Sequence, residues 1–145
     1  MELPVIEKYV EAEKLAADLG LKLIYGGKGA MRLNTVNVSR PGLLLAGFTD
    51  YFGENRIQVL GNAEFEYLLT MTHTVRRTKL EILAQQEIPC IIISRSREPF
   101  EELLDVVHRY EIPLFVTDNS TSSLVNVLVM YLNKILAPSI TRHAG

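Results

Sequence analysis

The stretch EIPCIIISRSREPFEELLDVVHRYEIPLFVTD, residues 87–118, decides the fold. Its two ends repeat one pattern, because EIPCIIIS at 87–94 and EIPLFVTD at 111–118 each place a proline before an apolar run. Proline at the first residue of a strand does little harm, since its missing N–H falls outside the hydrogen-bonded ladder. Neither run alternates apolar with polar residues, which predicts strands with helices on both faces.

The segments around this stretch extend the pattern. Between the two strands, a helix opens at residues 98–100, and Phe100, Leu103, Leu104 and Val107 have the spacing of its buried face. Helices are predicted at 62–71, capped by Asn62, and at 75–86, and a last helix runs from Asn119 or Ser120 to about residue 136. Such alternation implies parallel strands joined by right-handed crossovers. We therefore predict an α/β three-layer domain with a central mixed, largely parallel sheet.

The first sixty residues give a less regular pattern. A helix is predicted over 4–19, with Pro4 in its first turn and Gly20 as its stop. Short apolar runs then predict strands at 21–25, 32–39, 42–48 and 56–61. Their connections are short, so we expect them to add the mixed part of the sheet.

Composition limits the function classes. The chain has 145 residues, 48% apolar and 22% charged, with a net charge of −2, as in one globular domain. This charge argues against a nucleic-acid-binding protein, and no apolar run reaches the ~18 residues of a membrane span. The single cysteine, Cys90, lies in an apolar run and is interpreted as a buried small hydrophobe. We expect a cytoplasmic protein with no nucleic-acid or membrane partner.

Two loops carry the candidate ligand-binding residues. SRSRE at 94–98 and TDNSTSS at 117–123 each follow a predicted strand, at the edge where open α/β sheets bind ligands. Arg95, Arg97, Ser120 and Thr121 are the donors that an anion would meet there, and the competing interpretation is a solvated loop with a helix cap. GGKG at 26–29 is interpreted as a turn, because a phosphate loop requires a helix after it. His73, placed between helices, and His108, expected to be exposed, have no partner at metal-ligand spacing, so no metal site is predicted.

Several segments, in order, resemble the N-terminal domain of HPr kinase/phosphorylase. They are RPGLLLAGF, YF, RIQVLGNAEFEYL and IPCIIISR, which contain the motif residues Arg40, Pro41, Gly42, Gly47, Arg56, Gly61 and Glu64. The resemblance covers essentially the whole chain. It implies a fold similar to the N-terminal domains of Mur ligases, in agreement with the α/β prediction.

The resemblance also implies a function. The full-length family enzyme is an ATP-dependent serine kinase that phosphorylates the phosphocarrier protein HPr, reverses the reaction, is hexameric and acts in carbon catabolite regulation. Residues 1–137 would be its N-terminal regulatory or assembly domain, and 138–145 a linker to a missing C-terminal P-loop kinase domain. His143 corresponds to the active-site histidine, although Ala144 separates it from Gly145. ATP, Mg²⁺ and HPr would bind the missing domain, so the chain alone should be inactive and hold no cofactor.

Two other functions remain open from the residues alone. The chain is then either a stand-alone module that binds a small anionic ligand near Arg95 and Ser120, or a purely structural interaction domain.

Overall fold

The computed structural model describes residues 8–27, 32–34, 37–46 and 56–137. Its main sheet has the strand order β2–β7–β6–β5–β4, and only the β2–β7 pair is antiparallel. The strands are β2 (Lys22–Tyr25), β4 (Val38–Ser39), β5 (Ile57–Leu60), β6 (Ile91–Ile93) and β7 (Leu114–Val116). The prediction of a mixed, largely parallel sheet is confirmed.

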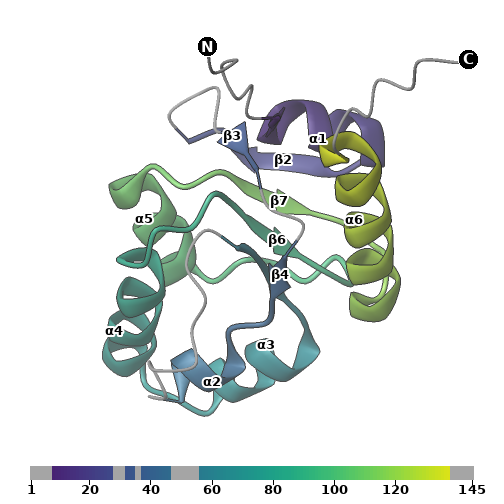
Figure 1. Cartoon of the computed structure of the whole chain (residues 1–145). Coiled ribbons are helices and arrows are strands. Elements are labelled where there is room, and N and C mark those ends of the chain that lie inside the picture. Colours follow the sequence, from purple (N-terminus) through teal and green to yellow (C-terminus); the bar gives the residue numbers. More distant parts are fainter. Residues whose placement is uncertain (1–7, 28–31, 35–36, 47–55, 138–145) are drawn as a thin grey trace, which may run out of the picture.

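Helices cover both faces of the sheet, as the unbroken apolar strands require (Figure 1). One face carries α2 (Gly42–Leu45), α3 (Asn62–Leu69), α4 (His73–Ala84) and α5 (Glu101–Tyr110). The other carries α1 (Ala12–Leu19) and α6 (Thr121–Leu136). The strands divide their side chains between the two cores, with Ile91 and Ile93 on the first face and Ile92 on the second.

Local sequence explains where several helices begin and end. Ser120 caps α6 by accepting a hydrogen bond from the Ser123 N–H, and Thr72 caps α4 in the same way through Val75. Gly20 ends α1 in the left-handed region, with a φ of 69°. The N-cap of α3 is Gly61, whereas the predicted cap, Asn62, is the first residue of the helix. The Glu64 carboxylate of the first turn accepts a hydrogen bond from the Gly61 N–H.

The predicted strand at 42–48 is wrong in its described part. Residues 42–45 form the short helix α2, in which the Leu45 N–H donates to Pro41 O at 2.9 Å. A short apolar run is ambiguous between a buried strand and a buried helix, and here Leu44 and Leu45 pack against the α3 and α4 side chains. Gly47 and Phe48 lie outside the described residues.

The predicted helix at 4–19 and the predicted strand at 32–39 also need correction. Val10–Glu11 form strand β1, which pairs antiparallel with β3 (Arg32–Leu33), so α1 begins only at Ala12. Residues 32–39 therefore contribute to two sheets, β3 to the small one and β4 to the large one. Tertiary pairing of Val10 with Leu33 overrides the local helical pattern, and residues 4–7 lie outside the described part.

The two ends of the described chain lie together. The Lys8 ammonium donates a hydrogen bond to the Ala137 carbonyl at the end of α6. A second contact joins α6 to α1, in which the Tyr131 hydroxyl donates a hydrogen bond to the Asp18 carboxylate. The segment that enters the domain and the helix that leaves it are thus joined to one another.

Candidate functional site

A buried carboxylate organises the edge of the sheet at which the parallel strands end. Arg40, directly after β4, donates from Nη2 to Glu64 Oε1 at 2.8 Å and from Nε at 3.3 Å. The Gly61 N–H, directly after β5, donates to the same oxygen at 2.8 Å. The Glu64 side chain is 4% exposed and that of Arg40 is 43% exposed. The pair is therefore anchored in the protein while the guanidinium still reaches the surface.

Two glycines allow this close approach. A Cβ at Gly61 would lie 2.4 Å from Thr121 Oγ1 and 3.0 Å from Arg40 Nη2. A Cβ at Gly42 would lie 3.3 Å from Glu64 Oε2. Three residues of the motif that carries the sequence resemblance, Arg40, Gly42 and Gly61, thus surround the carboxylate of a fourth, Glu64.

Hydroxyl groups continue the site toward α6. Ser94 follows β6, its N–H donates to Leu60 O, and its Oγ lies 2.7 Å from Thr121 Oγ1. Thr121 is the first residue of α6, so the ends of β5 and β6 and the start of α6 meet here. Parallel strands bring their carboxyl ends to one edge, the usual ligand-binding edge of open α/β sheets.

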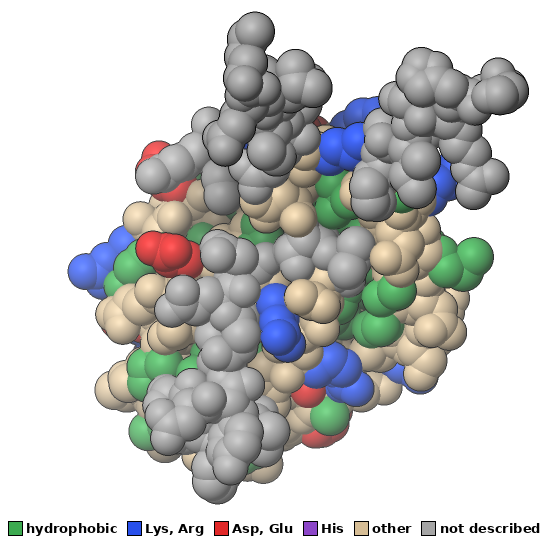
Figure 2. Space-filling view, viewed as in Figure 1, with side chains coloured by type: hydrophobic (Ala, Val, Ile, Leu, Met, Phe, Trp, Pro, Cys, Tyr) green, Lys and Arg blue, Asp and Glu red, His purple; other side chains and the backbone are tan. Residues whose placement is uncertain are grey.

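A surface cavity of about 260 Å³ opens beside this hydroxyl pair. Its lining comes from the arginine after β4 and the first turns of α6: Arg40, Thr121, Ser122, Val125 and Asn126. We call it the Arg40 cavity. In the view of Figure 2, Lys and Arg side chains lie near the middle of the molecule, and hydrophobic side chains lie on the side where Figure 1 shows α6. The cavity thus joins a cation to the N-terminal end of a helix, both of which attract negative charge.

The structure separates the four residues predicted to bind a ligand. Thr121 lines the Arg40 cavity, and Ser120 is occupied as the cap of α6. Arg97 donates to Glu66 at 2.8 Å and to Asn62 at 3.2 Å, and its guanidinium lies 4.9 Å from the Phe65 ring centroid. Its charge is therefore already paired.

Arg97 belongs to a different hollow from Thr121. It contributes to a cavity of about 360 Å³ together with Lys22, Ile24 and Leu104. Arg95 is exposed and has a left-handed φ of 58°, and its backbone N–H donates to Asn119 O. The four residues therefore do not form one pocket.

The remaining sequence-predicted positions are placed as follows. Pro41 is buried before α2, and Arg56 is half-buried before β5, with its carbonyl accepting from Gln58 Nε2. Gly47 and His143 lie outside the described residues.

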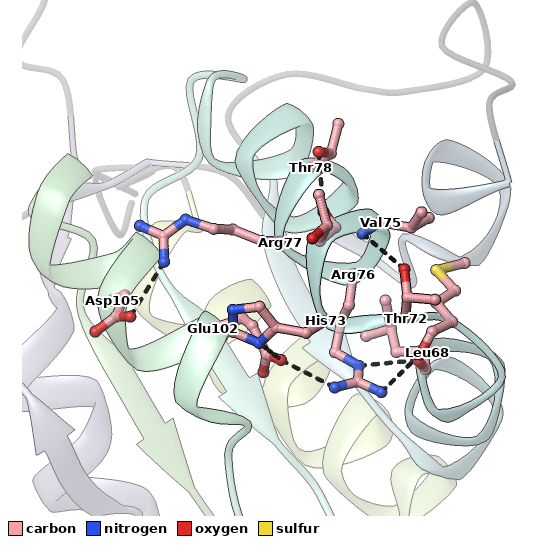
Figure 3. A network of polar contacts seen from close by, with 11 residues as sticks. Leu68, Thr72, His73, Val75, Arg76, Arg77, Thr78, Glu102 and Asp105 are labelled. Carbon is pink, nitrogen blue, oxygen red and sulfur yellow. Dashed lines mark hydrogen bonds and ion pairs between the residues drawn. The ribbon is translucent and has the colours of Figure 1, made fainter.

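A second polar cluster, shown in Figure 3, joins the end of α3 to α4 and α5. Arg76 on α4 donates to Glu102 Oε1 at 2.9 Å, to Leu68 O at 2.9 Å and to Met71 O at 3.0 Å. His73 Nδ1 lies 2.6 Å from the same Glu102 oxygen. A carboxylate only accepts hydrogen bonds, so this histidine nitrogen carries the hydrogen.

The electrostatics of Glu102 follow from these partners. Burial alone would raise the pKa of Glu102, but hydrogen bonds from its own backbone, His73 and Arg76, with the Arg76 charge, outweigh it and lower the pKa. Arg76 also lies 4.7 Å from the Phe100 ring centroid, and Phe100 stacks on Phe65 at 5.1 Å. All these groups are satisfied by one another, which indicates a structural tie between α3, α4 and α5.

The cysteine and the other histidine among the described residues lie outside both polar clusters. Cys90 is buried, and desolvation raises the pKa of its thiol to about 12, as expected for an inert cysteine. His108 is exposed, with its ring against Tyr25, whereas His73 is the first residue of α4 rather than part of a linker. Among the described residues, no three His, Cys, Asp or Glu side chains gather as metal ligands. The helices of that part of the chain are too short or too polar to cross a membrane.

Sequence reasoning did not single out three residues near the Arg40 cavity: Ser94 and Ser122, which lie within the two loops predicted to bind a ligand, and Asn126. Ser94 carried a usable signal, because a serine directly after an apolar strand lies at the ligand-binding edge. Ser122 and Asn126 lie one turn apart on α6, and nothing in their spacing relates them to Arg40 eighty residues earlier.

The chain matches the family described as HPr Serine kinase N terminus over residues 10–132. It belongs to this family. Its relatives in the family include the HPr kinase/phosphorylases of Caldicellulosiruptor bescii, 39% identical over 93% of this chain, and Alkaliphilus metalliredigens, 37% identical over 94%. That of Clostridium acetobutylicum is 36% identical over 92%. In each case the match covers 44% of the relative, so the chain spans less than half the length of these proteins.

A solved structure shows that the HPr serine kinase N-terminal fold occurs elsewhere. The CBS and DRTGG domains of the regulatory region of Clostridium perfringens pyrophosphatase, crystallised with its activator diadenosine tetraphosphate, superimpose with a TM-score of 0.62. The match covers 89% of this chain and 51% of that chain at 9% identity, so it concerns the fold alone. The α/β prediction is confirmed, and the likeness to Mur ligase domains stays a prediction.

Proposed function

We propose that this chain is the N-terminal regulatory or assembly domain of a bifunctional HPr kinase/phosphorylase. The single observation that carries the proposal is the family match over residues 10–132, joined to a share of only 44% of each relative. The whole enzyme would phosphorylate and dephosphorylate a serine of HPr and thereby regulate carbon-source use. It would act in the cytoplasm as a homo-oligomer, a hexamer by resemblance to the family.

The kinase chemistry is assigned to the part of the relatives that this chain does not span. ATP and Mg²⁺ need a phosphate-binding loop and carboxylate ligands. The sequence contains no G-x-x-x-x-G-K-[ST] phosphate loop, so we assign this chain no step of phosphoryl transfer. HPr would bind the same absent part, and by resemblance His143 would belong to its active site.

Activity assays test this division of labour. The 145-residue chain is incubated with HPr, ATP and Mg²⁺, with the full-length Caldicellulosiruptor bescii relative as positive control. We expect phosphoserine on HPr only with the relative, and phosphorylation by the chain alone would refute the proposed division. A chimera in which this chain replaces the matching part of the relative should keep kinase activity, whereas deletion of that part should change its regulation or assembly.

A second function, binding of a small anionic ligand, is favoured by the Arg40 cavity. The guanidinium is held by buried Glu64 yet faces the cavity, where the first turn of α6 lies. The fold is shared with a pyrophosphatase regulatory region that binds an activator, which agrees with a sensing role.

Thermal shift measurements test ligand binding. The chain is screened with phosphate, sulfate, AMP, ATP and diadenosine tetraphosphate, and a ligand at 100 times its dissociation constant should stabilise it by ~2.7 kcal/mol. Arg40→Gln should abolish the shift, while the exposed Arg95→Gln serves as control. If the anion instead binds near Arg95 and Arg97, as predicted from the sequence, Arg95→Gln should abolish the shift and Arg40→Gln should keep it. A domain with a purely structural role would show no shift with any anion.

A further inference from the structure

The connections after β6 and β7 leave the main sheet on opposite faces. The loop after β6 leads to α5, which packs in the core of the first face, and the loop after β7 leads to α6 in the core of the second. Where neighbouring parallel strands connect to opposite faces, their carboxyl ends border a crevice, and open α/β sheets bind ligands in that crevice. The ends of β6 and β7 are therefore a place to look for a ligand site.

Two adjoining cavities occupy this crevice. One, of about 360 Å³, lies toward α5, and the other, of about 270 Å³, lies toward the loop between β7 and α6. They share the lining residues Lys22, Ser96 and Val116, and we call them together the Lys22 cavity. The larger part is at the small end of the range for small-molecule sites, roughly 300–1,000 Å³. No lining residue is shared with the Arg40 cavity.

The rim of the Lys22 cavity contains strained backbone. Arg95 and Ser96 have left-handed φ angles of 58° and 51°, which cost free energy in residues that carry a side chain. Two hydrogen bonds hold them, from the Arg95 N–H to Asn119 O and from the Ser96 N–H to Thr117 O, each 2.8 Å long. Backbone strain that the surrounding structure maintains is concentrated at ligand-binding sites. The two loops thus form a fixed rim, with Ser96 in the lining of both parts.

Opposite charges line the Lys22 cavity without pairing. Lys22 on β2 lines both parts, whereas Glu98 lines the part toward α5 and Asp118 the part toward α6. Among the described residues, no ion pair joins Lys22 to either carboxylate. Arg97 also belongs to the lining, but its charge is matched by Glu66 at 2.8 Å. The cavity therefore offers both a cation and carboxylates to a ligand.

The part of the cavity toward α5 also has an apolar wall. Ile24, Pro99, Leu104 and Val116 line it together with Lys22 and Glu98. Three of the four apolar side chains pack against the core of the first face, so the fold fixes the wall in place: Ile24, Leu104 and Val116. An apolar wall between a cation and a carboxylate complements a molecule that has an apolar body and carries both charges.

We propose that the Lys22 cavity binds a small zwitterion with an apolar body, of the chemical class of the free aliphatic amino acids. The ligand carboxylate pairs with the Lys22 ammonium, and the Ser96 hydroxyl is a second donor to it. The ligand ammonium pairs with Glu98, which lines the same part of the cavity as the apolar wall. A simple anion would meet the carboxylates of the lining, and a simple cation would meet Lys22 and Arg97, so neither complements the whole lining.

This site is distinct from the anion site proposed at Arg40 and does not depend on the kinase assignment. Its failure would leave both of those proposals untouched.

Calorimetric titrations of the 145-residue chain test the ligand class. The probes are L-leucine, L-isoleucine, L-valine and L-methionine, up to about 10 mM, where ligands with millimolar dissociation constants saturate. Isocaproate, which is leucine without its ammonium, and isoamylamine, which is leucine without its carboxylate, are the matched controls. We expect at least one of the amino acids to bind and each control to bind at least about tenfold more weakly, because it loses one charged contact. Absence of binding by all four amino acids, or a control that binds as tightly, would refute the zwitterion site.

Substitutions test the location of the ligand. Lys22→Gln and Glu98→Gln should each weaken amino-acid binding by about tenfold, for the same reason. Lys134→Gln and Glu101→Gln are the matched controls, since both residues are exposed and lie outside the lining, and they should bind as the wild type does. Wild-type affinity in Lys22→Gln or in Glu98→Gln would overturn the proposed contacts. Circular dichroism checks that each variant is folded.

NMR spectra of the wild type locate the ligand without any substitution, which covers the case of a variant that does not fold. The bound amino acid should shift the amide signals of Ser96 and Glu98 and leave that of Asn126, in the Arg40 cavity, unchanged. The variant Arg40→Gln should keep amino-acid binding, although it should lose any anion-induced thermal shift. Shifts at Asn126 without shifts at Ser96 would place the ligand in the Arg40 cavity and refute the inference.

Discussion

Arg40 Nη2 lies 2.8 Å from Oε1 of Glu64, an oxygen that also accepts the Gly61 N–H. The carboxylate is buried and the guanidinium is partly exposed to water. The two partners of this ion pair therefore lie in different environments. Removing the buried partner should cost more than removing the exposed one, because the helix N-terminus after β5 would lose its acceptor as well.

Glu64→Gln should therefore destabilise the domain. The amide keeps the size of the side chain but loses the charge that Arg40 and the Gly61 N–H bind, and the expected loss is about 1–3 kcal/mol in the free energy of unfolding. Urea denaturation measures it. Glu66→Gln is the control, since Glu66 is mostly exposed and its pair with Arg97 should be worth under about 1 kcal/mol. Equal losses in the two variants would contradict the assignment of Glu64 as the organising residue.

Gly61→Ala should be destabilising for a steric reason. The new Cβ would lie 2.4 Å from Thr121 Oγ1, so α6 or β5 must shift, at a cost of about 1–3 kcal/mol. Gly61→Ala combined with Thr121→Ala should recover part of this loss, which a double-mutant cycle in urea would reveal. Gly26→Ala is the control, because the nearest atom to its Cβ is Glu13 Oε1 at 3.8 Å. No coupling between positions 61 and 121 would refute the steric explanation.

Stability should fall in acid through Glu102. Its pKa is lower in the folded protein than the ordinary value of 4.5, so it binds protons more weakly when folded. The stabilisation is therefore fully present above about pH 4.5 and is lost as the pH falls through the folded pKa. Urea denaturation from pH 7 to pH 3 should show this decline.

The matched variant Glu102→Gln should be less stable than the wild type at pH 7, with a smaller further loss in acid. The pKa of Asp18 is also lowered, by hydrogen bonds from Tyr131 and Lys14, so some acid dependence remains in the variant. An unchanged acid dependence in Glu102→Gln would show that this carboxylate does not contribute.

Gln58→Leu should stabilise the domain. Gln58 is fully buried on β5, and its Oε1 has no hydrogen-bond partner among the described residues, while Nε2 donates to Arg56 O. An unsatisfied buried acceptor costs about 1–3 kcal/mol, and leucine removes it at similar volume, so we expect a gain of about 1 kcal/mol after the lost Nε2 bond. Thermal and urea denaturation measure the gain. Gln86→Leu is the control and should change little, whereas a loss of stability in Gln58→Leu would indicate a required hydrogen bond.

The second half of the fold could be predicted from the sequence because its information is local. β6, α5 and β7 each have an apolar pattern of the right period, and Ser120 marks the start of α6. Residues 10–11 and 42–45 were mispredicted, and the predicted strand at 32–39 was not divided between two sheets, because two- and four-residue elements have no period and distant partners decide their state. The Arg40 cavity was missed for a similar reason, since it joins Arg40 to Ser122 and Asn126 only through the sheet order. Glu64 was identified by resemblance, and its role as a shared acceptor required the structure.

The contact between Lys8 and Ala137 holds the two ends of the described chain within hydrogen-bonding distance. Any polypeptide joined to these two residues would therefore arrive and depart at neighbouring points of the domain. A circular permutant that links the two positions and opens new ends at exposed Glu87 should therefore keep the β4 to β7 core intact. Retention of the fold in such a permutant, measured by circular dichroism and urea denaturation, would show that the covalent order of the two ends is not required for folding.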